Sequence, residues 1–371
     1  MNNKRFFFSS PAYIDLSVTN ACNLNCLYCY AEAGPNNNIY MPYETVKKLL
    51  DEIEESGVSY IRIAGGEPLV HPEINKILNL VGGAKMLSSM STNAINIDSK
   101  MAKTIAQSGL DWVVVSLDGH NKEINNATRG GFNQTVRGVR YLLEEGVKTK
   151  LACVITQKNY LFISDIIEFA KKLGVDSIGF ILFSQVGRAV ENKISLSLNY
   201  NSLKYIVEFV NEYKKNSTNL SIKVNLVFPH ESFIPWEISM FISEYDIKKY
   251  WIPNKRDSER FLGCQAGITT CSISADGSVY GCEQLMSFPE MAAGNIHERA
   301  FLSIWNEGQA FELLRAIDID DITGGCSTCL NKGCGGGCRA IAYAQSHNIL
   351  ASCDSCKEIY KNNDREEFFC E

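Results

Sequence analysis

The sequence lacks the features that mark exported, membrane-spanning and nucleic-acid-binding proteins. After Lys4 and Arg5, only Phe6–Phe8 are apolar before polar residues resume, which is too short for a signal-peptide core or a membrane span. No polybasic run or heptad repeat occurs. The net charge of −6 argues against a phosphate-backbone partner, which would favour a basic surface. We therefore predict a cytoplasmic protein with no membrane partner and no nucleic-acid partner.

Cysteine is the residue type in excess, with 14 among 371 residues. Without an export signal these thiols are not expected to form disulfides, and a chain of this length needs none to stabilise its core. Most of them cluster at short spacings, which is typical of metal ligands. Cys153 lies inside the apolar run Leu151–Ile155, and we interpret it as a small core residue.

Apolar strands alternate with amphipathic helices along the first 214 residues. The expected strands are Tyr13–Val18, Val58–Ala64, Lys85–Thr92, Trp112–Leu117, Val147–Ile155 and Val175–Phe183. The expected helices are Met41–Ser56, Pro72–Val81, Asp98–Ser108, Phe132–Glu145, Ile163–Leu173 and Ser202–Lys214. Near-continuous apolar strands that alternate with helices predict a parallel sheet covered by helices. The sequence therefore predicts an α/β fold, a partial (β/α)6 barrel of the TIM type.

Loops rich in cysteine, glycine and polar residues follow five of these strands. In such barrels the functional loops lie at the carboxyl ends of the strands. The loops in question are Cys22–Cys29, Gly65–Pro68, Ser91–Asn93, Ser116–Gly119 and Gly187–Arg188. Because they follow different strands, we expect them to converge on one rim of the barrel.

The segment Cys22–Tyr30 has the spacing C-x3-C-x2-C, with a tyrosine on each side of the third cysteine. Three thiolates can hold three irons of a four-iron, four-sulfur cluster and leave the fourth iron free to bind a small molecule. From these nine residues alone, a zinc knuckle or three buried thiols is the alternative. The spacing resembles the signature of the radical S-adenosylmethionine (SAM) enzymes, in which the open iron chelates the amino and carboxylate groups of SAM.

The loops after the next strands resemble the other SAM-binding elements of that family. Glycines at Gly65–Pro68 allow close backbone approach, and backbone groups there can bond the SAM ammonium. Arg129 could pair with the SAM carboxylate as a fork-shaped donor. The resemblance implies that the cofactor-binding residues are Gly65, Gly66, Glu67, Ser91, Asn93, Ser116, Asp118 and Arg129. Cap and turn residues, and a solvated arginine, remain the alternative interpretation.

Beyond Asn225 the barrel pattern ends, and from Cys264 onwards the chain is rich in glycine and contains ten cysteines. Cys264, Gly277 and Cys282 fit the pattern C-x(9–15)-G-x4-C of the SPASM domain, an extension of radical SAM enzymes that binds two auxiliary clusters. The later spacing C-x2-C-x4-C-x3-C departs from that family only at its middle gap, where five residues are commoner. We therefore expect a barrel at 1–228, a linker or capping segment at 229–260 and a small cysteine-rich SPASM domain at 261–371.

The resemblance implies three 4Fe–4S clusters in total. The ligands carried over are Cys22, Cys26 and Cys29 for the SAM-binding cluster; Cys264, Cys271, Cys282 and Cys338 for the first auxiliary cluster; and Cys326, Cys329, Cys334 and Cys356 for the second. Cys353 is the reserve for the last position, and an open iron is known at the first auxiliary cluster of some relatives. Zinc held by C-x2-C pairs is the alternative for this region.

The chemistry implied by the resemblance is reductive cleavage of SAM to a 5′-deoxyadenosyl radical, which removes hydrogen from an unactivated C–H bond. Auxiliary clusters can accept the electron that the substrate then loses, so we expect a net oxidation or a cross-link. Glu283, directly after Cys282, occupies the position of an aspartate base in sulfatase maturases, and we predict it to be the catalytic base. A carboxylate that bonds only the local backbone is the alternative.

Relatives with this two-domain plan mostly modify peptide or protein side chains, by thioether or carbon–carbon cross-linking, oxidation or epimerisation. The resemblance therefore implies a peptide or protein substrate and an electron donor such as flavodoxin or ferredoxin. Only 21 residues precede Cys22, so we expect any leader peptide to be held by a separate protein or by the barrel and linker. The alternatives are a sulfatase-maturase-like Cys or Ser oxidation, a tetrapyrrole or small-molecule dehydrogenase, and a non-enzymatic Fe–S or zinc scaffold or electron carrier.

Overall fold

The computed structural model describes residues 7–199, 201–203, 205–206, 209, 212–213, 223–227, 262–328 and 336–353. The predicted linker at 229–260 lies outside the described residues, as do Cys329, Cys334, Cys356 and part of the helix predicted at 202–214. In the described part of the chain no helix is both long and apolar enough to cross a bilayer.

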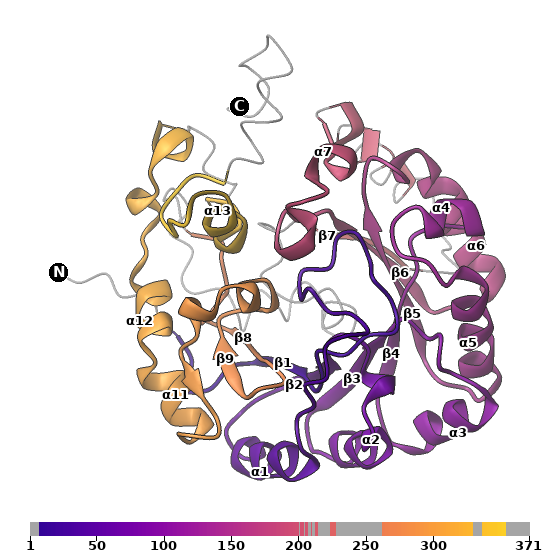
Figure 1. Ribbon diagram of the computed structural model, residues 1–371, viewed down its shortest axis with the longest axis horizontal. Coiled ribbons are helices and arrows are strands. Elements are labelled where there is room, and N and C mark those ends of the chain that lie inside the picture. Colours follow the sequence, from indigo (N-terminus) through magenta and orange to yellow (C-terminus); the bar gives the residue numbers. More distant parts are fainter. Residues whose placement is uncertain are drawn as a thin grey trace.

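A ten-stranded open sheet forms the centre of the molecule (Figure 1). Its strands are β1 (Tyr13–Ser17), β2 (Tyr60–Ala64), β3 (Leu87–Thr92), β4 (Trp112–Ser116), β5 (Thr149–Ile155), β6 (Ser177–Leu182), β7 (Lys223–Val227), β8 (Thr270–Ile273), β9 (Ser278–Tyr280) and β10 (Gly294–Asn295), in the order β10-β9-β8-β1-β2-β3-β4-β5-β6-β7. Strands β1 to β7 are parallel neighbours. The six predicted strands are confirmed to within two residues, and β7 adds a parallel strand that the sequence pattern did not predict.

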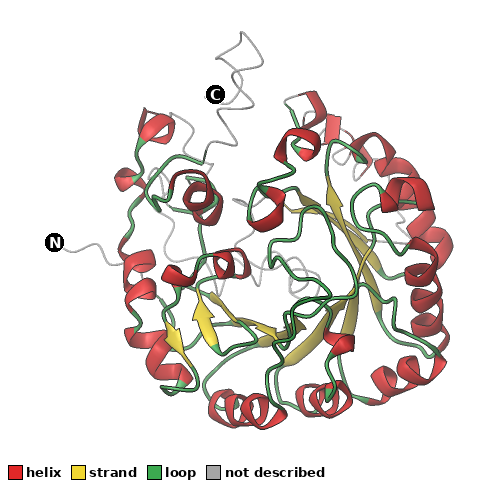
Figure 2. Cartoon of the chain, in the orientation of Figure 1, coloured by secondary structure: helices red, strands yellow, loops and turns green. Residues whose placement is uncertain are grey.

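Helices form an outer layer around the strands (Figure 2). They are α1 (Tyr43–Ile53), α2 (Ile74–Gly82), α3 (Ser99–Gln107), α4 (Lys122–Asn126), α5 (Phe132–Glu144), α6 (Ile163–Leu173), α7 (Lys193–Leu196), α11 (Phe301–Glu307), α12 (Gln309–Ala316) and α13 (Arg339–Ser346). The helical spacing of Val46, Leu49, Leu50 and Ile53 buries one face of α1. Asp98 caps α3 by accepting a 2.8 Å bond from Met101 N.

Short 3₁₀ segments complete the described elements. They are η1 (Pro68–Val70), η2 (Tyr160–Phe162), η3 (Gly187–Ala189), η4 (Glu283–Ser287), η5 (Pro289–Met291), η6 (Ile319–Asp321) and η7 (Gly324–Thr328). Two of them, η3 and η4, lie against the cysteine loop, as described below.

The cysteine-rich region continues the sheet of the first region, a strand pairing that the sequence did not predict. Strand β8 pairs in parallel with β1, and β9 and β10 extend the sheet in antiparallel fashion. The carboxylate of Glu52 on α1 accepts from Phe301 N (3.0 Å) and Leu302 N (2.8 Å) at the start of α11. Buried residues of both regions also belong to one hydrophobic cluster. The two regions therefore form one continuous structure.

The inner face of the sheet carries charged side chains on β1 and β2 and aromatic side chains at the amino ends of the strands. Side chains alternate along β1, so Ile14 and Leu16 join the hydrophobic core with the helices while Asp15 faces inward, where it pairs with Arg62. At the amino ends of the strands, the ring of Tyr60 stacks between Tyr13 (centroids 4.9 Å apart) and Trp112 (5.2 Å). These stacked rings lie at the amino ends of β1, β2 and β4, away from the loops at the carboxyl ends that form the site.

Candidate functional site

The cysteine loop leaves the carboxyl end of β1 and is held by backbone bonds from neighbouring strand ends. Gly66 N donates to Thr19 O (2.8 Å), and Glu67 N donates to Ala21 O (2.9 Å). Farther along the loop, Leu27 N donates to Thr128 O (2.9 Å). The predicted convergence of the rim loops on this segment is therefore present in the structure.

Two glycines explain how closely the loop approaches β2. A Cβ on Gly65 would lie 2.3 Å from Thr19 O, and one on Gly66 would lie 2.2 Å from Ala21 O. Both distances are far inside van der Waals contact, so only glycine fits at either position. The Gly-Gly pair thus positions the cysteine loop, and its contact with SAM stays a prediction.

The rim segment Gly187–Arg188 also binds the cysteine loop through hydrogen bonds, a role that the sequence did not suggest. Arg188 donates from Nη1 to Cys26 O and from Nη2 to Ala33 O, both at 2.8 Å. Its backbone N–H donates to Cys29 O (3.1 Å). Asn192 Nδ2 donates to Leu27 O (3.0 Å). The glycine-arginine pair in the loop after β6 was the signal available in the sequence.

The thiols of Cys22, Cys26 and Cys29 lie close enough to influence one another electrostatically. Burial, with smaller contributions from Glu67 and the other two thiols, raises the pKa of Cys22 to about 12. Burial likewise raises the pKa of Cys26. Ligation by iron must therefore displace these protons. Three thiols from one loop match the donor set of a four-iron cluster with an open iron, so the residues fit that group. No three His, Cys, Asp or Glu side chains among the described residues are arranged to hold a single metal ion.

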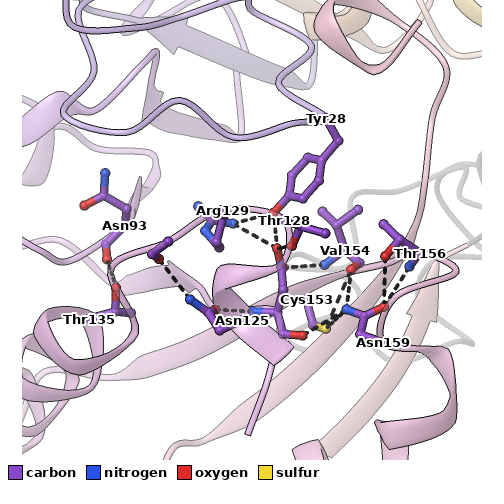
Figure 3. Close-up of polar contacts among 12 residues, drawn as sticks. Tyr28, Asn93, Asn125, Thr128, Arg129, Thr135, Cys153, Val154, Thr156 and Asn159 are labelled. Carbon is purple, nitrogen blue, oxygen red and sulfur yellow. Dashed lines mark hydrogen bonds and ion pairs between the residues drawn. The ribbon is translucent and has the colours of Figure 1, made fainter. Parts of the chain in front are cut away.

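Asp118 and Arg129 each bond to Tyr28 of the cysteine loop; Figure 3 shows Arg129 beside the Tyr28 hydroxyl. The fully buried Asp118 accepts from the Tyr28 hydroxyl, from Thr128 Oγ1 (3.2 Å) and from Val154 N (2.9 Å). Arg129 Nη1 donates to the Tyr28 hydroxyl (2.8 Å) and lies 3.7 Å from Asp118 Oδ2. These residues thereby fix the ring that precedes the third cysteine. Their contact with SAM remains a prediction.

Glu67 and Asn93 likewise bind protein groups around the cysteine loop. Glu67 Oε1 accepts from Thr92 Oγ1 (2.6 Å), and Oε2 accepts from Asn93 N (2.7 Å). Asn93 Nδ2 donates to Asn23 Oδ1 in the cysteine loop (2.7 Å). Ser91 and Ser116 lie half-buried at the carboxyl ends of β3 and β4, as predicted. All eight residues predicted to bind the cofactor therefore lie around the cysteine loop or at adjacent strand ends.

The charged side chains of Asp15 and Arg62 on the inner face of the sheet form an ion-pair network with Glu283 of η4. Arg62 binds Asp15 through Nε (3.1 Å) and Nη2 (2.5 Å), and Nη2 also forms an ion pair with Glu283. Burial alone would raise the pKa of Asp15, but the Arg62 guanidinium and the surrounding hydrogen bonds hold it below its usual value. The sequence-based prediction did not include Arg62. An arginine within an apolar strand was nevertheless a usable sign of a buried charge that needs a partner.

Segment η4 links the barrel to the cysteine-rich region. It begins directly after Cys282, and Ser287 Oγ at its end donates to Tyr30 O, next to Cys29, at 2.5 Å. Between them, Gln284 contacts Ser184 at the end of β6 and Cys338. One short segment therefore touches both predicted cluster sites.

The structure brings Cys264, Cys282 and Cys338 together but leaves Cys271 apart. Burial raises the pKa of Cys282, and the nearby Cys338 and Cys264 thiols add to the effect. Cys271 shares the face of β8 with Ile273, and both belong to the hydrophobic core. Side-chain alternation along β8 directs Cys271 toward the core, which disfavours it as a ligand, and its assignment to the first auxiliary cluster stays a prediction.

The remaining cysteines divide between the described and undescribed parts of the chain. Cys353 packs beside Cys338 and also influences its thiol electrostatically. Cys326 N donates to Ser352 Oγ (2.9 Å), so the C-terminal end of the described chain adjoins this cysteine. The other three ligands predicted for the second auxiliary cluster lie outside the described residues.

Comparisons with known proteins agree with this layout. Residues 16–173 match the family described as the radical SAM superfamily, and residues 264–330 match SPASM, described as an iron–sulfur cluster-binding domain. An AdoMet-dependent heme synthase of Oleidesulfovibrio alaskensis is 26% identical over 362 residues, covering 94% of this chain and 88% of that protein. Mycofactocin maturase MftC of Mycolicibacterium smegmatis is 24% identical over 338 residues, covering 90% and 79%. The crystal structure of Streptococcus suis SuiB bound to precursor peptide SuiA superimposes with a TM-score of 0.73 at 20% identity, covering 94% and 76%.

Proposed function

Because the chain belongs to the radical SAM superfamily of enzymes and carries a C-terminal SPASM domain, we propose that it modifies a peptide or protein side chain by radical-initiated oxidation, cross-linking or epimerisation. The observation that carries the proposal is the position of η4. This segment connects the cysteine loop to Cys282 and Cys338 and presents Glu283 to the inner face of the barrel. A substrate held between the two cysteine sites could lose hydrogen on one side and an electron on the other.

Two relatives support a peptide substrate. One is named a mycofactocin maturase, and SuiB was solved with a precursor peptide. The partners that follow are a small electron donor such as flavodoxin or ferredoxin and, if the substrate has a leader segment, a separate leader-binding protein. The cofactors are SAM and three 4Fe–4S clusters, one of them held by Cys22, Cys26 and Cys29.

The residues of this chain would orient and shield the reaction. When bound, the cluster and SAM supply a 5′-deoxyadenosyl radical that removes hydrogen from the substrate. Tyr28, fixed by Asp118 and Arg129, covers one side of the cysteine loop. Glu283 is the base that takes the substrate proton, and its ion pair with Arg62 fixes the carboxylate at the inner face. Exclusion of water by these groups protects the reactive species.

Anaerobic reconstitution tests the proposed function. We expect about twelve irons per chain and release of 5′-deoxyadenosine after one-electron reduction in the presence of SAM. Peptides encoded beside the gene are then offered as substrates, and mass spectrometry detects a loss of two hydrogens, a new cross-link or an epimer. Tightly bound zinc without SAM turnover would instead show a scaffold.

A tetrapyrrole substrate is the second candidate, because a relative that matches most of this chain is named a heme synthase. The same reconstituted enzyme is offered iron-coproporphyrin, and loss of carboxyl groups from its propionates is followed by mass spectrometry. Turnover of the tetrapyrrole without turnover of any peptide would replace the peptide proposal.

Replacing Glu283 with glutamine tests the assignment of the base. We expect SAM cleavage to persist while product falls by about 10²-fold or more, because the amide keeps the size of the side chain but cannot take a proton. Glu290→Gln is the matched control, since that exposed carboxylate accepts from the Tyr343 hydroxyl (2.9 Å) and is not paired with Arg62. Unchanged product formation by Glu283→Gln would remove the base assignment.

A further inference from the structure

The side chain of Gln284 lies between a predicted cluster ligand and the end of a barrel strand. Its Oε1 is 3.7 Å from Cys338 Sγ, within hydrogen-bond range for sulfur, and its Nε2 donates to Ser184 Oγ at 3.3 Å. Gln284 follows Glu283 on η4, whereas Ser184 follows β6. The amide therefore joins the barrel to the auxiliary cysteines at one point.

The direction of this hydrogen bond depends on the chemical state of Cys338. A thiol donates to the amide oxygen, which is the arrangement seen here. A thiolate that ligates iron has no proton and can only accept. Rotation of the amide by 180° exchanges its oxygen and nitrogen with almost no change of shape, so Nε2 can then donate to the sulfur.

Ser184 makes that rotation possible without loss of a partner. A hydroxyl can either donate or accept, so it accepts from Nε2 in the first arrangement and donates to Oε1 in the second. The half-buried amide keeps two partners in both states. The hydrogen bonds among Ser184, Gln284 and Cys338 can therefore form whether Cys338 is a thiol or an iron-bound thiolate.

We propose that Gln284, anchored by Ser184, donates a hydrogen bond to the Cys338 thiolate of the first auxiliary cluster and thereby raises its reduction potential. The inference rests on the proposed function for that cluster. Reduction adds one electron to the cluster, and an N–H group directed at a ligand sulfur stabilises the more negative state more strongly. Gln284 is thus a positioning and tuning residue that makes the cluster a better electron acceptor.

Anaerobic redox titration of the reconstituted enzyme, monitored by electron paramagnetic resonance, tests the proposal. Gln284→Leu should keep the iron content but lower the equilibrium constant for reduction of one cluster by about tenfold or more. The effect is large because hydrogen bonds to charged groups are stronger than those between neutral groups. Ser184→Ala should shift the same cluster in the same direction by less. Gln345→Leu is the matched control, because it removes an amide that donates to another glutamine, Gln185 Oε1 (3.2 Å).

The outcomes separate this proposal from the proposed function. If the wild-type enzyme has its auxiliary clusters and Gln284→Leu leaves every midpoint potential unchanged, the tuning role is overturned while the function stands. If the wild-type enzyme has no auxiliary cluster, both fall. Should the leucine variant lose iron, Gln284→Glu, which keeps the size and removes the N–H donor, must still lower the potential of one cluster; an unchanged potential there also overturns the proposal.

Discussion

Replacing Cys282 or Cys338 with alanine is expected to remove about four irons per chain, while Cys271→Ala leaves the iron content unchanged. The physical reason is the alternation of side chains along β8. Cys271 is 1% exposed within the hydrophobic core, whereas Cys282 and Cys338 lie together with Cys264. Product formation should be lost in the first two variants, because the electron acceptor is missing.

Iron analysis of the anaerobically reconstituted variants, together with Mössbauer spectra, measures this difference. Thermal unfolding is followed in parallel, because removal of a buried thiol from the core lowers the free energy of unfolding by about 1 kcal/mol. A loss of four irons in Cys271→Ala without loss of folded protein would restore this residue as a ligand. Retention of all iron in Cys338→Ala would contradict the ligand set that the structure brings together.

The second large effect is expected at Gly187, where a single methyl group should disturb the SAM-binding site. This glycine has φ +60°, and a Cβ there would lie 2.5 Å from Tyr30 O and 2.8 Å from Cys29 O. Neither carbonyl is at the end of a flexible side chain, so the cysteine loop itself must move. In Gly187→Ala we expect partial loss of iron and a fall in 5′-deoxyadenosine formation of about 10²-fold, because small displacements at a reacting centre have effects of that size.

Gly174→Ala separates this steric effect from backbone strain. Gly174, at the end of α6, also has a left-handed conformation (φ +83°), but nothing lies within 4 Å of the position that a Cβ would take there. The left-handed backbone therefore costs both variants about 1 kcal/mol, and only Gly187→Ala displaces the loop. Equal SAM cleavage by the two variants would show that the contact with the cysteine loop does not matter.

The cysteine spacings, the glycine pair and the strand pattern were enough to predict much of this site. Local signals suffice there because three ligands occur within one loop, and because parallel strands deliver their carboxyl ends to one edge. For Cys271 the motif gave no information about which face of β8 the side chain occupies, and only the structure places it in the hydrophobic core. The sequence also gave no sign that the first strand of the cysteine-rich region pairs with β1 across more than two hundred residues.

The partners of two arginines at the site were also beyond prediction. Arg188 binds the cysteine loop and Arg62 binds Glu283, and nothing in the local sequence around either arginine specifies these distant partners. Asp118 and Arg129 lie at the cysteine loop, and their predicted contact with SAM stays a prediction. Their bonds to Tyr28, however, depend on the folded arrangement of β4 and the cysteine loop.

The sequence by itself determined the α/β class, the parallel strands and the three-cysteine loop, because each of these depends on short-range spacing and periodicity. Only the tertiary structure decided which cysteines meet, how η4 connects two groups of cysteines and what the inner charges contact. Those features depend on pairings between distant segments, whose free energy is gained only when the whole sheet and its shared core are assembled.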